Sequence, residues 1–195
     1  MRSRIYSILF TTVIGISLAS SCDKNDVETP SGELPDPIQI NLRSAEQEIL
    51  KTDQAFAFAF FDKVFEEESV AEDPNFMVSP LSLSMALAMT LNGAAGDTKT
   101  AMQEALLWSD FPDEEAINSY YKKLNEALLK TDPSTRLSIA NAIFTNQSVT
   151  INPNFINTNQ TWYDATVQRV DFSNPATTAV INQWASDHTN GLIKK

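Results

Sequence analysis

Residues 75–106, NFMVSPLSLSMALAMTLNGAAGDTKTAMQEAL, decide the fold of this chain, because they join an apolar helix to a second helix through a glycine corner. Ser79 is typical of a helix N-cap, and Pro80 suits the first helical turn, where no amide hydrogen is needed. Nearly every side chain from 81 to 91 is apolar, which is typical of a helix buried on every side. A helix over 80–92 is also too short to cross a bilayer, which takes roughly 20 residues. The segment therefore predicts a helix inside a globular core.

The residues after this helix predict a sharp corner and a further helix. Gly93 and Gly96 end the first helix, and Asp97 is expected to cap the next one. The apolar residues of that next helix recur at helical spacing: Ala101, Met102, Ala105 and Leu106. The hydroxyls of Ser79 and Ser82 are explained, from the residues alone, as a cap and a serine bonded back to its own helix.

Helical spacing also predicts one helix before this segment and one after it. The first covers about 44–67, with a buried face and two phenylalanines beside it: Ile49, Phe56, Phe60 and Val64, then Phe61 and Phe65. The second follows Pro112, and its apolar face consists of Ile117, Tyr121, Leu124 and Leu128.

The last third of the chain alternates strands and helices. Residues 136–145 are apolar on both faces, which is typical of a central strand, and 165–172 predict a second strand. A short helix begins at Asn152-Pro153 between them. A last helix follows Asn174-Pro175, places Ile181, Trp184 and His188 on one face, and ends near Gly191.

Residues 75–82 and 91–98 closely resemble the second-helix signature of the serpins. Further blocks follow in the order of that family: 137–144 (LSIANAIF), Phe155, 163–165 (YDA), 170–172 (VDF), 181–184 (INQW) and 189–194 (TNGLIK). The resemblance covers roughly 42–195. The residues that carry it are Asn75, Ser79, Pro80, Ser82, Asn92, Gly93, Gly96, Asn141, Phe155, Tyr163, Asp171, Phe172, Asn182, Trp184, Thr189 and Gly191.

This resemblance implies an α+β fold in which N-terminal helices pack behind a large mixed β-sheet and the last helix lies across the front of that sheet. It implies inhibition of a serine protease, or in some members a cysteine protease, by insertion of a cleaved reactive loop. The hydroxyls of Ser79 and Ser82 would belong to the shutter beneath the opening sheet. Their role would be conformational, and the protein would be an inhibitor with no catalytic residues.

The family is about twice as long as this chain, so we expect 42–195 to be the N-terminal part of an incomplete serpin domain. The reactive loop and its reactive-site bond would then be absent, and the chain as given would be non-inhibitory. The alternative is a non-inhibitory, serpin-shaped binding lipoprotein of the cell envelope. A third possibility, an enzyme, would need an ionisable cluster from outside this sequence.

The N-terminus predicts export. Arg2 and Arg4 precede an apolar run over 5–18 and a short stretch of small residues, which is the layout of a signal peptide over 1–21. Cys22 follows, and it resembles the lipidated cysteine of bacterial lipoproteins. Lipid on Cys22 would anchor the protein to the outer membrane, on its periplasmic or outer face. The alternative is ordinary secretion with a free thiol, since a single cysteine forms no intrachain disulfide.

Residues 22–41 are expected to form a disordered acidic tether. Positions 23–37 alone hold three prolines and five acids, with too little apolar surface to fold.

Composition argues against several function classes. The net charge of −11 disfavours nucleic acid, and removal of the signal would take away two basic residues and no acid. Around the fourth predicted helix, Lys122, Lys123 and Lys130 are mixed with acids, so a heparin-like polyanion is not expected to bind. One histidine and one cysteine disfavour zinc and redox pairs, and five glycines leave no phosphate loop. We therefore predict no metal and no cofactor; a serine triad using His188 is the remaining alternative.

Overall fold

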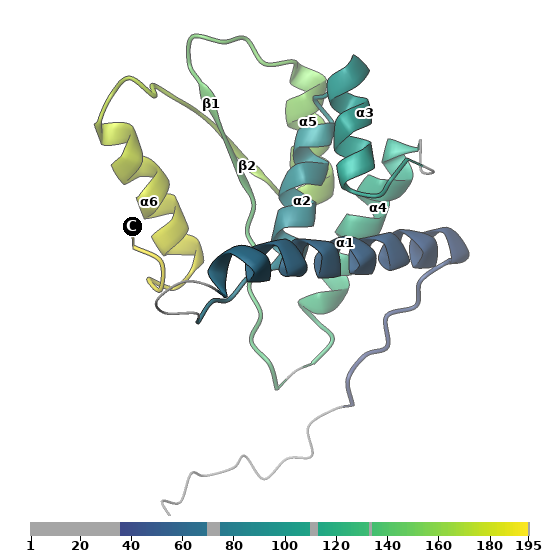
Figure 1. The fold of residues 1–195 in the computed structure, drawn as a ribbon. Helices are drawn as coiled ribbons and strands as arrows, with labels where there is room; N and C mark the ends of the chain where they lie inside the picture. Colours follow the sequence, from purple (N-terminus) through teal and green to yellow (C-terminus); the bar gives the residue numbers. More distant parts are fainter. Residues whose placement is uncertain (1–35, 70–74, 110–112, 133, 195) are drawn as a thin grey trace, which may run out of the picture. The chain divides into compact units, whose positions relative to one another are not determined.

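The computed structural model of this protein describes residues 36–69, 75–109, 113–132 and 134–194. Six helices and two strands lie within these ranges (Figure 1). In chain order they are α1 (Ser44–Glu68), α2 (Pro80–Leu91), α3 (Gly96–Ala105), α4 (Glu114–Leu128), β1 (Ala142–Asn146), α5 (Pro153–Tyr163), β2 (Thr166–Val170) and α6 (Ala176–His188). This is the order of helices and strands that the sequence predicts.

Two helices begin at the residues expected from sequence, and α4 begins at a cap that was not predicted. The Ser79 hydroxyl accepts a hydrogen bond from the Ser82 amide at 3.3 Å, and Pro80 follows in the first turn of α2. Asp113 accepts from the amides of Glu115 and Ala116 at the start of α4. At the start of α5, Asn152 accepts from the Asn154 amide.

The predicted cap of α3 is wrong. This helix begins at Gly96, and Ala95 precedes it without a side-chain cap. Gly96 has a φ of +56°, so the chain already turns there into the helix and Asp97 lies inside the first turn. The carboxylate of Asp97 does not cap the helix, but its negative charge interacts favourably with the positive N-terminal end of the helix dipole.

The strands form a parallel pair connected by α5. Ala142 pairs with Thr166 and Asn146 with Val170. This pair is the part of the expected large mixed sheet that the described residues contain. The strand predicted over 136–145 is shorter than expected, because hydrogen bonding begins at 142, where β2 supplies a partner. The strand predicted over 165–172 is similarly confined to 166–170.

The core lies where α1, α2, α4 and α5 meet. Its largest fully buried side chains are aromatic, and Tyr121 is at its centre. The Tyr121 ring centroid lies 5.9 Å from Trp108, 5.1 Å from Tyr120 and 6.0 Å from Tyr163. Rings at these distances and tilts attract each other beyond the gain from burial alone.

The burial of α2 on every side is not observed. Met85, Ala88 and Met89 are buried, but Ala86 and Thr90 are exposed on the opposite side. Among the described helices, α2 contacts α1, α3, α4 and α5, and these contacts leave Ala86 and Thr90 uncovered.

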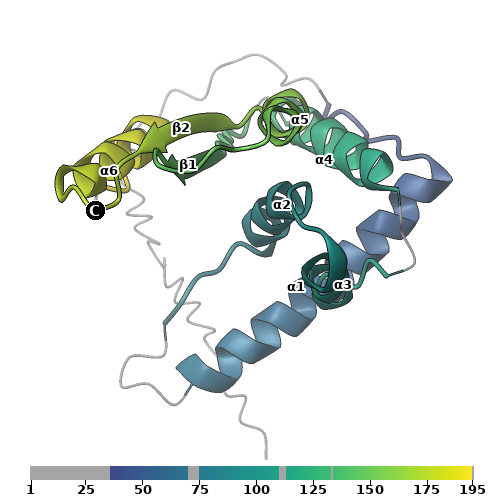
Figure 2. The same ribbon diagram turned by 90° about the horizontal axis from the view of Figure 1, so that it is seen from above.

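The phenylalanines of α1 are also less buried than predicted. Phe56 and Phe60 are half-buried and stack on each other, whereas Phe61 and Phe65 are exposed by 43% and 51%. In Figure 2 the last turns of α1 run on beyond α2. There Phe61 stacks on Phe65 and meets Phe76 at 5.7 Å, and these contacts cover the two rings only in part.

The N-terminal predictions lie mostly outside the described residues. The signal peptide, Cys22 and the tether up to residue 35 belong to this part of the chain. Residues 36–41 have no regular secondary structure, and the Ile38 amide donates to the Thr131 carbonyl at 2.8 Å. Across the described ranges, no helix is long and apolar enough to cross a membrane.

Candidate functional site

A groove of about 650 Å³ lies between α2, the chain leading into β1, and α6. Within the described ranges, β1 pairs with β2 along one edge only. Five of the residues that carry the serpin resemblance line this groove: Ser79, Ser82, Asn141, Trp184 and Thr189. The structure therefore brings together residues separated by more than a hundred positions in the sequence.

Ser79 and Ser82 form the start of the α2 wall. Their hydroxyl oxygens lie 2.7 Å apart, and both side chains are exposed. The cap predicted at Ser79 is confirmed, whereas the Ser82 hydroxyl bonds to the Ser79 hydroxyl and not to its own helix. Both residues also line the groove.

Trp184 anchors α6 to β1. Its ring meets the Phe144 ring edge-on at 6.1 Å and stacks on the His188 ring at 4.3 Å. The predicted shared face of Ile181, Trp184 and His188 is confirmed, since all three line the groove. The His188 Nδ1 lies 2.8 Å from the Trp184 carbonyl, which ties this ring to its own helix.

The end of α6 is closed by a turn. The Thr189 hydroxyl donates to the Ala185 carbonyl at 2.7 Å and accepts from the Ile193 amide at 3.0 Å. The Gly191 amide donates to the Ser186 carbonyl, and Gly191 has a φ of +76° that favours glycine. Thr189 and Gly191 thus set the direction in which the chain leaves the groove.

Two family residues, Asn92 and Tyr163, join Asn118 in a polar network that links α2, α4 and α5. The Asn118 amide nitrogen donates to Asn92 Oδ1 at 2.9 Å, and Asn92 Nδ2 donates to Asn118 Oδ1 at 3.1 Å. The Tyr163 hydroxyl donates to the same Asn118 oxygen at 2.6 Å. Burial raises the pKa of Tyr163, so it remains a neutral donor.

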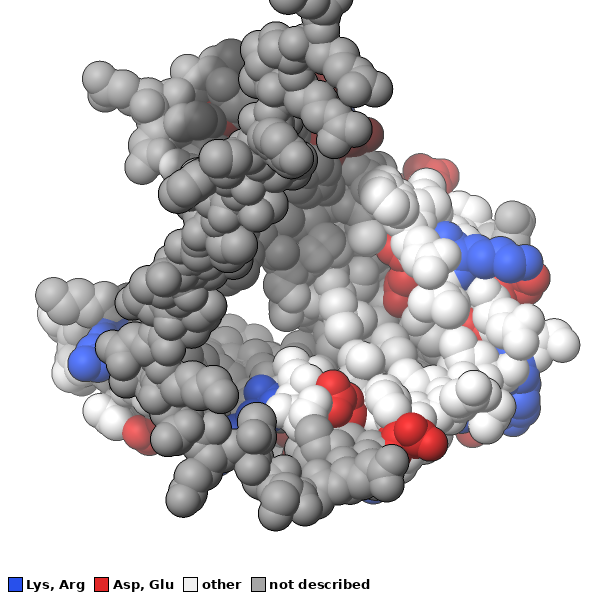
Figure 3. Space-filling model, turned by 90° about the horizontal axis from the view of Figure 1, so that it is seen from below, with Lys and Arg blue, Asp and Glu red and all other residues white. Residues whose placement is uncertain are grey.

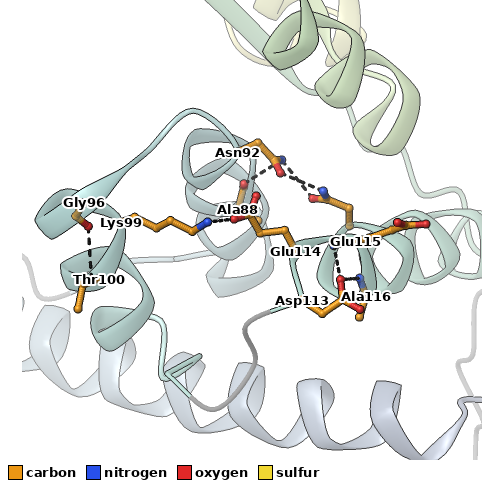
Figure 4. A network of polar contacts seen from close by, with 10 residues as sticks. Ala88, Asn92, Gly96, Lys99, Thr100, Asp113, Glu114, Glu115 and Ala116 are labelled. Atoms are coloured by element: carbon orange, nitrogen blue, oxygen red, sulfur yellow. Dashed lines mark hydrogen bonds and ion pairs between the residues drawn. The ribbon is translucent and has the colours of Figure 1, made fainter.

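Figure 4 shows how the end of α2 is held at this network. Asn92 reaches back to the Ala88 carbonyl and across to α4, while Lys99 of α3 pairs with Glu114. Side chains therefore fix the end of α2 to α4, and α3 to α4.

Asn141 joins the start of β1 to the end of α5. Its side-chain nitrogen donates to the Tyr163 carbonyl at 3.0 Å, and its own carbonyl accepts from the Thr166 amide at 2.9 Å. Gly93 is required for packing: a Cβ there would lie 2.9 Å from the Phe155 ring. These contacts give physical reasons for Asn141, Gly93 and Phe155.

The remaining family residues lie apart from both groups. Asp171 accepts from the Ser173 amide and shapes the turn before α6, Phe172 is 52% exposed, and Asn182 is half-buried. Asn75 is exposed in the extended segment before α2. The structure gives these four no place in the groove.

Sequence reasoning missed three polar residues on buried faces. Asn118 lies beside Ile117 on the apolar face of α4, and Glu46 and Asp53 lie on the stripe of α1 that holds Ile49 and Phe56. Glu46 and Asp53 lie three or four residues from Ile49, and Asn118 lies three residues from Tyr121; this helical spacing was the available signal.

Basic and acidic side chains are interspersed on the described surface in Figure 3. On α4, Lys122 lies over the Trp162 ring and donates to the Thr161 carbonyl, while Lys123 pairs with Glu46. Two of the three lysines considered for polyanion binding are therefore engaged within the fold. Among the described residues, no group of histidine, cysteine or acidic side chains could hold a metal ion.

Comparison with known proteins gives a family for this arrangement. The family model described as serpin (serine protease inhibitor) matches residues 51–195. This chain belongs to the serpin family. Human antithrombin-III is 31% identical over 178 residues, which cover 89% of this chain and 38% of antithrombin-III. The leukocyte elastase inhibitor of Xenopus laevis is 35% identical over 141 residues, or 71% of this chain and 36% of the inhibitor.

Solved structures agree with this assignment of the fold. Human thyroxine-binding globulin matches with a TM-score of 0.67 and 27% identity, over 77% of this chain and 40% of the globulin. The chain thus has part of the serpin fold and spans well under half the length of these relatives.

Proposed function

We propose that this chain is the N-terminal half of a serpin that inhibits serine proteases. The observation that carries the proposal is the groove beside β1, lined by the family's serines on α2 and by Trp184 on α6. Leukocyte elastase inhibitor, a relative of this chain, is named for such an activity.

The arrangement suits a sheet that takes up additional strands. In the family's mechanism, cleavage of an exposed loop lets that loop insert into the main sheet. The edge of β1 that no described strand pairs with offers backbone donors and acceptors to a neighbouring strand. The open side of α2 gives that sheet an apolar surface to slide over, with Ser79 and Ser82 at its end.

The test uses the intact protein, meaning the full-length serpin of which this chain is proposed to be the N-terminal half. It is incubated with a panel of serine proteases and analysed by denaturing electrophoresis. We expect a one-to-one complex that survives denaturation, with loss of protease activity. The 195-residue chain alone is the matched control, and we expect it to form no complex because the reactive loop lies outside it. Cleavage of the intact protein without a stable complex would refute the proposal.

The second candidate is a serpin-shaped binding protein without inhibitory activity. It is favoured by the match to thyroxine-binding globulin, whose name states a ligand-binding role on this fold. This candidate predicts that proteases cleave the intact protein as an ordinary substrate. The complex assay therefore separates the two candidates.

We also propose that the protein is an outer-membrane lipoprotein anchored through Cys22. The support comes from sequence: Arg2 and Arg4, an apolar run over 5–18 and small residues before the cysteine. Labelling of cells with radioactive palmitate should mark the protein, and Cys22→Ser should abolish the label. Equal labelling of the Cys22→Ser variant, or a wild-type protein found only in the medium, would contradict the anchor.

We propose that no heparin-like polyanion activates the inhibitor. The net charge of −11 and the internal pairing of Lys122 and Lys123 both support this. The intact protein should pass through a heparin column at low salt, and retention there would refute the proposal.

A further inference from the structure

Two carboxyl groups lie on the apolar stripe of α1 where it contacts α4. Glu46 is 3% exposed and Asp53 is half-buried, and both share the stripe with Ile49 and Phe56. Acidic side chains are seldom buried unless they are paired. Each of these two meets a different kind of partner on α4, so the two ends of the contact respond to protons in opposite ways.

Glu46 is held as a carboxylate. Its Oε2 accepts from Lys123 Nζ of α4 at 2.7 Å and from the Arg43 amide at 2.6 Å. Its Oε1 accepts from the Arg43 guanidinium at 2.7 and 3.0 Å. Burial alone would raise the pKa of Glu46, but these hydrogen bonds and the nearby Lys123 charge lower it to about 2.

Asp53 has phenols as partners. Its Oδ1 accepts from the Tyr121 hydroxyl at 2.8 Å, and its buried Oδ2 has no hydrogen-bond partner among the described residues. The Tyr120 hydroxyl is near enough to lower the pKa of Asp53. It makes no hydrogen bond of ordinary geometry with any described residue. Burial raises the pKa of Asp53 to about 6, although the two tyrosines lower it in part.

The other groups around Asp53 do not compensate its charge. Tyr163 of α5 feels that charge, which together with burial raises the pKa of this phenol. Ser84 of α2 lies near enough to influence Tyr121, and its hydroxyl is neutral. Among the described residues, no cation thus pairs with the ionised form of Asp53.

We infer that the contact between α1 and α4 is a pH-responsive joint, tightest near pH 4 and looser in more acidic and in neutral solution. This inference does not depend on the proposed inhibitory function. It assigns Glu46 and Asp53 as two opposed proton sensors within one helix contact.

The two limbs follow from the pKa changes on folding. The pKa of Glu46 falls from 4.5 to about 2, so its stabilisation is complete above 4.5 and is lost as the pH falls towards 2. The pKa of Asp53 rises from 3.8 to about 6, so its stabilisation is complete below 3.8 and is lost as the pH rises through 6. The loosening of the contact between α1 and α4 at neutral pH is therefore due to Asp53.

Native-state hydrogen exchange of α4 amides in the intact protein tests this joint. After correction for intrinsic exchange, we expect the opening of α4 to increase about 10- to 100-fold between pH 4 and pH 7. Asp53→Asn keeps the shape of the side chain and removes its titration, so the increase should vanish. Asp62→Asn, an exposed change on the same helix, is the matched control and should leave the increase intact.

Glu46→Gln should have the converse effect. It should remove the rise in opening below pH 4.5 while the neutral limb remains, and Glu67→Gln, exposed on α1, is its control. An unchanged neutral limb in Asp53→Asn would overturn the inference. If that variant does not fold, the carboxyl resonance of Asp53 in the wild type decides: titration near pH 6 supports the joint, and titration at or below 4 overturns it.

Discussion

At the scale of single residues, Gly93 shows how one missing side chain positions a helix. A Cβ at this position would lie 2.9 Å from the Phe155 ring, so the ring, or α5 with it, would have to move away from the end of α2. Gly93→Ala should lower the free energy of unfolding of the intact protein by about 1–3 kcal/mol in urea denaturation. Phe155→Leu should recover part of that loss in the double variant, and strictly additive losses would contradict the steric explanation.

Asn118 carries a second prediction at this scale. Its Oδ1 accepts from both Asn92 and Tyr163 inside the core, so Asn118→Ala leaves buried groups without partners. We expect a loss of about 2–4 kcal/mol in the free energy of unfolding. Tyr163→Phe removes one of these hydrogen bonds and should cost about 1 kcal/mol. Equal losses in the two variants would show that Asn118 does not join the network.

At the scale of elements, removing the N-caps of α2 and α4 in turn distinguishes an effect on stability from an effect on function. Ser79→Ala and Asp113→Ala each remove an N-cap, and each should cost about 1 kcal/mol in thermal or urea unfolding. Of these two residues, Ser79 is the one that lines the groove. Under the proposed function, Ser79→Ala should therefore also change the fraction of intact protein that ends in protease complex. A similar change in Asp113→Ala would mean that the effect is one of stability alone.

Element limits could be predicted where local chemistry fixes them. Ser79 and Asn152 mark helix starts because a side-chain oxygen accepts hydrogen bonds from free amides only two or three residues away. The Asp113 cap is equally local, but it was not predicted. Asp97 is not a helix cap because α3 already begins at Gly96, where the positive φ turns the chain into the helix. The extent of β1 could not be predicted, because it depends on a partner strand more than twenty residues away.

At the scale of the whole molecule, burial was the weakest prediction. The apolar patterns of α1 and α2 indicate faces that need cover, but they do not say what supplies it. In the described residues that cover is complete around Tyr121 and only partial around Phe61 and Phe65. The groove itself could be predicted only through the family resemblance, since Ser79 and Trp184 are brought together by the fold and share no local pattern.

The central claim is that the main sheet of the intact protein takes up its own cleaved loop. The most direct measurement is thermal unfolding before and after the reactive loop is cut by a protease that the protein does not inhibit. Insertion adds a strand to the sheet, so the cleaved form should unfold at a markedly higher temperature than the uncut form. An unchanged or lower unfolding temperature after complete cleavage would contradict the account.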